Sequence, residues 1–123
     1  MKGLHLVVVS PVREEANPIA QYLRDAGAQV FEVASFDELD PKGLLPHAVV
    51  VLADEVTPTT LCYDLAAYSL RQPTVCAILL TADIRQLPMI LAGSDSRIRL
   101  VARSAPYWVL KEAIRRQTSR AEV

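Results

Sequence analysis

The chain has 123 residues, enough for one domain with a buried core. Hydrophobic residues make up 51% and charged residues 22% of the sequence, a balance that excludes an intrinsically disordered chain. The 13 basic and 14 acidic side chains give a formal charge of −1, which argues against nucleic acid or an anionic membrane as a partner.

Five short apolar runs predict β-strands, at residues 4–9, 29–34, 47–53, 74–80 and 98–102. The first, third and fourth runs are nearly continuous in apolar residues, as in strands covered on both faces of a parallel sheet. The second and fifth runs alternate apolar with polar residues, which is typical of strands at a sheet edge.

Segments with helical spacing separate these strands. The first helix is predicted by apolar residues at helical spacing, and Gly27 marks its end; the stripe is Val12, Ala16, Ile19, Leu23 and Ala26. Asn17 as N-cap and Pro18 as first residue leave a second start open, in which the regular helix begins only there after an irregular lead-in at residues 11–16. A short second helix should break near Pro41.

The last three helices follow the third, fourth and fifth strands. The third is capped by Thr57-Pro58, and the fourth begins after Asp83 and is interrupted by Pro88. The fifth begins at Pro106 and should end in a frayed polar tail at about residues 118–123.

This alternation predicts an α/β fold: a doubly wound (βα)₅ three-layer sandwich around a five-stranded parallel sheet, with residues 1–123 forming a single domain. Binding sites of such sheets lie outside the carboxyl ends of the strands. The residues to inspect are therefore Ser10, Pro11, Asp54, Thr81 and Arg103.

These strand ends resemble the receiver domain of bacterial two-component response regulators, and the resemblance covers nearly the whole chain. Residues 54–58, DEVTP, have the D-x-x-x-P spacing of the receiver's phosphoacceptor aspartate, and residues 79–82, LLTA, match the end of its fourth strand. Arg103 stands where receivers carry a lysine, and Leu110 falls on the inward leucine of their last helix. The resemblance implies a flavodoxin-like strand order of 2-1-3-4-5.

Several positions depart from the receiver pattern. Ser10 and Pro11 replace an acidic pair, although Mg²⁺ prefers anionic oxygens and phosphoryl transfer to an aspartate needs that cation. Arg103 is followed by Ser104 instead of proline, and a guanidinium does not replace an ammonium geometrically. Leu100 replaces the aromatic residue that many receivers place shortly before their lysine.

Four alternatives remain open at these strand ends. Glu14 or Glu15 would supply a carboxylate, especially if residues 11–16 form a loop, and Arg103 would pair with Asp54 in place of a phosphate. Receivers often have a proline shortly before their third strand, and aligning Pro46 with it would put Leu52 or Ala53 at the phosphoacceptor position. We prefer Asp54 because it places a carboxylate at the strand end. Thr81 would either bind a phosphoryl group or cap the turn that follows it.

The last helix carries the candidate interface. If its apolar positions face inward, then Tyr107, Trp108, Lys111 and Arg115 lie partly on the outside. Receivers commonly dimerise or bind partners through the fourth helix, fifth strand and fifth helix, so the resemblance implies a protein partner or a homodimer there. The alternative is that Trp108 packs against the fourth helix.

Other residues give weaker signals. His5 and His47 fall at the amino end of the predicted sheet without metal-ligand spacing, and we interpret them as structural. The chain has only 4 glycines and no phosphate-binding fingerprint, so dinucleotide binding is disfavoured. Cys62 and Cys76 have no CxxC spacing, and we interpret them as free thiols of a reducing compartment. No apolar segment has the length of a membrane span, and no signal peptide is evident. Together these features predict a cytoplasmic location.

The favoured hypothesis is a degenerate, non-enzymatic receiver that needs no cofactor and acts by phosphorylation-independent protein–protein interaction. In that case Asp54, Thr81, Arg103, Ser10 and Pro11 form a vestigial phosphoacceptor site. The first alternative is a working receiver that takes a phosphoryl group from a histidine kinase on Asp54 with Mg²⁺. The second is a flavodoxin-like sensor that binds a small ligand at the strand ends.

Overall fold

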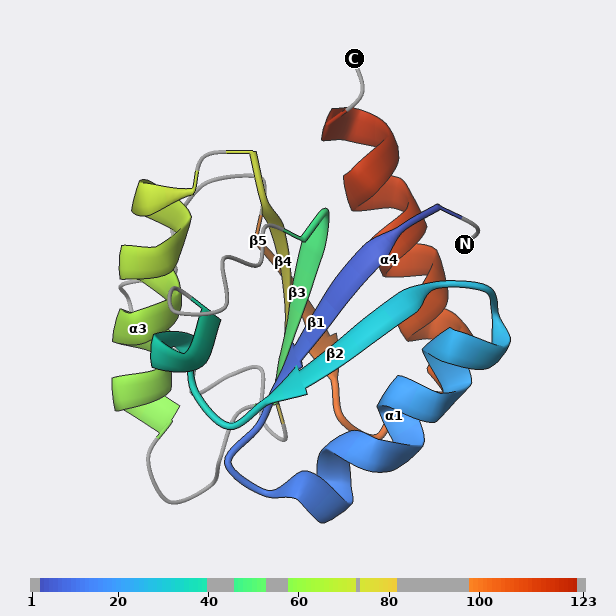
Figure 1. The fold of residues 1–123 in the computed structure, drawn as a ribbon, viewed down its shortest axis with the longest axis horizontal. Helices are drawn as coiled ribbons and strands as arrows, with labels where there is room; N and C mark the ends of the chain where they lie inside the picture. The colour runs from blue at the N-terminus through green and yellow to red at the C-terminus, as the bar shows by residue number, and fades with distance from the viewer. Residues whose placement is uncertain (1–2, 40–45, 53–57, 73, 82–97, 122–123) are drawn as a thin grey trace.

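The computed structural model describes residues 3–39, 46–52, 58–72, 74–81 and 98–121, and the fold is drawn in Figure 1. Its five strands are β1 (His5–Val9), β2 (Gln29–Val33), β3 (Ala48–Leu52), β4 (Cys76–Thr81) and β5 (Ile98–Ala102). All four strand pairs are parallel, and the order is β2-β1-β3-β4-β5. The predicted sheet and its order are confirmed.

Helices cover both faces of the sheet and make three layers (Figure 1). Helices α1 (Arg13–Asp25) and α4 (Tyr107–Ala121) lie on one face, and the 3₁₀ turn η1 (Phe36–Glu38) and helix α3 (Pro58–Arg71) lie on the other. The predicted break near Pro41 and the predicted helix after Asp83 lie outside the described residues.

Because helices cover both faces of the sheet, its inner strands are apolar at consecutive positions. In β1, Leu6 and Val8 join the core beneath α1 and α4, whereas Val7 and Val9 join the core beneath α3 and η1. Every residue of β3 and β4 is buried, while the edge strand β2 leaves Phe31 exposed. A strand buried on both faces must be apolar at consecutive positions, as the sequence pattern indicated.

Helix α1 begins at Arg13, the earlier of the two starts that the sequence left open, and Pro18 lies inside it. The N–H groups of Glu15 and Ala16 both donate to the Val12 carbonyl and close the first turn. Proline at position 18 removes one helical hydrogen bond, but burial of the apolar stripe that starts at Ala16 outweighs that loss. Residues 13–16 are therefore helical, which excludes the alternative of a start at Asn17 after an irregular lead-in.

Helix α4 differs from the prediction, because it continues to Ala121 where we expected a frayed tail from about residue 118. The side chains of Gln117 and Thr118 are buried, and the Thr118 hydroxyl donates to the Ile114 carbonyl at 2.8 Å. The Cys76 thiol is buried and donates to the Gln117 carbonyl, so this last part of the helix is attached to β4. Within the described parts of the chain, no helix combines the length and apolarity needed to span a membrane.

Candidate functional site

The parallel sheet brings the carboxyl ends of its strands to one edge, where the predicted site residues lie. Ser10 follows β1, Thr81 ends β4 and Arg103 follows β5. The backbone N–H of Arg103 donates to the Thr81 carbonyl at 2.9 Å, which fixes the start of the β5–α4 connection beside β4. Asp54 lies outside the described residues, so its relation to these three is not part of the structure.

The Ser10 hydroxyl is used within the turn that leads from β1 to α1. Its Oγ accepts a hydrogen bond from the Val12 N–H at 3.1 Å and donates to the Val12 carbonyl at 3.0 Å. The residue is 4% exposed, and its own N–H donates to the Val33 carbonyl of β2. Pro11 is exposed in the same turn and carries no polar side-chain atom. The Ser10 hydroxyl therefore holds this turn together, at a position where the resemblance to receivers would place an acid.

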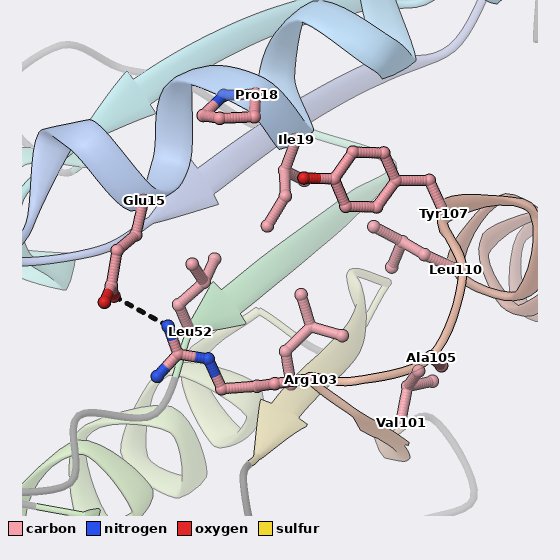
Figure 2. A pocket seen from close by; sticks show the side chains of 10 residues that line it. Glu15, Pro18, Ile19, Leu52, Val101, Arg103, Ala105, Tyr107 and Leu110 are labelled. Carbon is pink, nitrogen blue, oxygen red and sulfur yellow. Dashed lines mark ion pairs between the residues drawn. The ribbon is translucent and has the colours of Figure 1, made fainter.

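Arg103 forms an ion pair with Glu15, on the first turn of α1. Arg103 Nη2 lies 2.8 Å from Glu15 Oε2 (Figure 2). Their side chains are 24% and 45% exposed, so solvent screening limits the pair to about 1 kcal/mol or less. The sequence raised Glu15 as a nearby carboxylate, especially if residues 11–16 formed a loop; in the structure Glu15 reaches Arg103 from a helix. Glu14 is exposed, and the expected pairing of Arg103 with Asp54 involves a residue outside those described.

A cavity of about 240 Å³ lies beside this ion pair, between α1 and α4. Apolar side chains form most of its wall, contributed by Pro18, Ile19, Leu52, Leu80, Val101, Ala105 and Leu110. Three polar residues complete the lining: Glu15, Arg103 and Tyr107. In Figure 2 the Tyr107 hydroxyl is directed toward Ile19, across the cavity from the Arg103 side chain.

The candidate interface residues divide into two groups. Tyr107 lines the cavity, and its ring centroid lies 5.3 Å from that of Tyr22 on α1. Trp108 is 63% exposed on α4; Arg115 is also exposed, whereas Lys111 is partly buried. The predicted inward positions, Leu110 and Ile114, are buried. The outer face of α4 therefore presents an unusually exposed tryptophan near cationic side chains.

The two histidines lie at the amino end of the sheet, away from the site. The rings of His5 and His47 stack with centroids 5.6 Å apart, and His47 Nδ1 accepts the His5 N–H at 3.0 Å. The sequence placed them at this end but did not reveal that they are in contact. Among the described residues, no three His, Cys, Asp or Glu side chains converge as a metal site would require.

No known family model and no curated protein sequence matches this chain. Its fold does match solved structures. The signal receiver domain of an HD domain-containing protein from Pseudomonas fluorescens superposes with a TM-score of 0.80 at 16% identity, covering 99% of this chain and 91% of that one. The chain has the receiver fold.

Two further solved structures share the receiver fold with this chain. The N-terminal domain of a response regulator/sensory box/GGDEF protein from Carboxydothermus hydrogenoformans gives a TM-score of 0.77 at 16% identity over 96% of both chains. A response regulator receiver protein from Burkholderia phymatum gives 0.76 at 17% identity, over 94% of this chain and 95% of that one. Within the receiver fold, Ser10, Thr81 and Arg103 lie at the strand ends that the sequence resemblance assigned to them.

Replacing Ser10 with alanine tests its role in the β1–α1 turn. The substitution leaves the Val12 N–H without its partner, whereas the Val12 carbonyl still accepts from the Glu15 and Ala16 N–H groups, so we expect Ser10→Ala to lower the free energy of unfolding by about 1 kcal/mol. Urea denaturation measures the change. The matched control is Ser104→Ala, at an exposed serine, which should stay within about 0.5 kcal/mol of the parent. Equal effects at both positions would contradict the assigned role.

Proposed function

We propose that this chain is a degenerate receiver, a non-enzymatic cytoplasmic signalling domain that acts through phosphorylation-independent contacts with a protein partner. The observation that carries the proposal is the ion pair between Arg103 and Glu15. The cation at the receiver's lysine position already has an internal carboxylate 2.8 Å away. In a phosphorylated receiver, the corresponding cation is expected to bind the phosphoryl group.

The Ser10 turn supports the same proposal. A divalent cation at the strand ends needs several hard, preferably anionic oxygens in near-octahedral geometry. Ser10 contributes a neutral hydroxyl that is engaged with Val12, and Pro11 contributes no side-chain oxygen. Glu15, a nearby anion, is directed to Arg103. These described residues therefore make a poor Mg²⁺ site, which disfavours transfer of a phosphoryl group to Asp54.

The outer face of α4 is the proposed contact surface. Trp108 offers a large apolar area that water covers in the free domain, and Arg115 and Lys111 add donors for a polar rim. Aromatic and cationic side chains in this arrangement are typical of residues that dominate the energy of protein interfaces. We propose a protein partner as the occupant; a homodimer through the last strand and helix is the alternative.

A magnesium titration distinguishes the degenerate receiver from the phosphoacceptor hypothesis. We expect the ¹H–¹⁵N spectrum to show no saturable change when Mg²⁺ and beryllofluoride, a phosphoryl mimic, are added together, because the metal lacks anionic ligands. Asp54→Ala serves as the control for any response at the acceptor. Sub-millimolar binding of Mg²⁺, or beryllofluoride shifts that need Mg²⁺ and vanish in Asp54→Ala, would replace this proposal with a working phosphorelay.

The interface proposal is tested by removing the exposed indole. We expect Trp108→Ala to weaken partner capture or self-association at least tenfold, since interface tryptophans commonly contribute more than about 1.4 kcal/mol. Quantitative pulldown and sedimentation velocity measure the two modes separately. The control is Tyr63→Ala, which removes an exposed aromatic ring from α3 on the other face of the sheet. If Trp108→Ala behaves like the parent in both assays, the outer face of α4 is not the interface.

A further inference from the structure

The cavity between α1 and α4 has the chemistry of a ligand site rather than of a packing defect. Its wall is mostly apolar, with Arg103 and Glu15 on one side and the Tyr107 hydroxyl on the opposite side. Apolar walls with a small number of placed polar groups are characteristic of small-molecule sites. Its volume, about 240 Å³, lies below the roughly 300–1,000 Å³ of drug-sized sites, which limits the ligand to a small one.

We propose that this cavity binds a small carboxylate with a short hydrocarbon body. The body would lie against Ile19, Val101 and Leu110, where removing it from water is favourable. The carboxylate would reach the Arg103 guanidinium, which presents planar paired donors suited to that group. The Tyr107 hydroxyl lies across the cavity from Arg103, so it belongs to the wall around the hydrocarbon body and not to the carboxylate site.

The Glu15 carboxylate occupies the position against Arg103 that we propose for the ligand carboxylate. Glu15 Oε2 already lies 2.8 Å from Arg103 Nη2, which demonstrates that a carboxylate fits against this guanidinium at the cavity. The Glu15 side chain is 45% exposed on the first turn of α1, so it can rotate into solvent without leaving a buried charge behind. A bound carboxylate would thus replace Glu15 and release the side-chain link between α1 and the β5–α4 connection.

Other ligand classes fit the cavity less well. A cationic ligand would place its charge beside Arg103, and a neutral alcohol would leave the ion pair unchanged and gain only from the apolar wall. Inorganic phosphate would bring no apolar body to bury and would lose hydration against Ile19 and Leu110. The combination of apolar wall and guanidinium selects an amphipathic anion. This inference does not depend on the proposed protein partner.

Hexanoate is the probe, titrated into ¹⁵N-labelled protein and followed by amide chemical shifts. We expect saturable shifts centred on residues that line the cavity, with hexylamine and 1-hexanol binding at least tenfold more weakly. Arg103→Gln should weaken hexanoate binding at least fivefold, because the charged partner is lost. Glu15→Gln should tighten it by about two- to fivefold, since a competing, partly exposed ion pair is removed.

Glu14→Gln is the matched control, because Glu14 is an exposed acid next in sequence that does not line the cavity. It should leave hexanoate affinity unchanged. The proposal is overturned if hexanoate causes no saturable shift up to about 20 mM. It is also overturned if 1-hexanol binds as tightly as hexanoate, or if Glu15→Gln and Glu14→Gln have the same effect. Thermal unfolding of each variant confirms that it retains the fold.

Discussion

The carboxylate of Glu15 and the guanidinium of Arg103 meet 2.8 Å apart at the carboxyl edge of the sheet, and this pairing sets the character of the site. A parallel sheet brings the ends of all its strands to one edge, where charged groups must find partners or remain hydrated. Here the cation after β5 is balanced from within the domain by an acid on α1. An anion arriving from outside must therefore compete with a group that is already in place.

The position of Glu15 depends on the connection that precedes it. The Ser10 hydroxyl closes the turn around Val12, and Val12 in turn accepts the first hydrogen bonds of α1. This early start places Glu15 on the first turn of the helix, above the edge that Arg103 reaches from β5. The Ser10 turn and the ion pair of Arg103 with Glu15 are thus parts of one local arrangement.

Much of the fold was predictable from the sequence because strands buried on both faces must be apolar at consecutive positions. The runs in β1, β3 and β4 gave that signal directly. The start of α1 stayed open between Val12, where the apolar stripe begins, and Asn17, where the capping residues favour a start. Burial of Ala16 and the hydrogen bonds to Val12 decide for the earlier one. The end of α4 was missed because Gln117 and Thr118 are polar, yet they are buried and hydrogen-bonded.

The location of the site was predictable from the sequence, but the ion pair between Arg103 and Glu15 was not. Topology alone places Ser10, Thr81 and Arg103 at one edge. The contact of Arg103 with Glu15 depends on which turn of α1 faces that edge, and this follows from where the helix begins. The cavity was not foreseen either, because its lining comes from α1, three strands and the start of α4. Because α1 begins at Arg13 and not at Asn17, Glu15 lies on its first turn and is available as a partner for Arg103.

Incubation with radiolabelled acetyl phosphate tests whether the charge balance at this edge excludes metal-assisted phosphorylation, as we propose. The purified chain is incubated with and without Mg²⁺, and with EDTA. We expect no incorporation above background under any of these conditions. Label that requires Mg²⁺, is prevented by EDTA and is lost in Asp54→Ala would contradict this proposal.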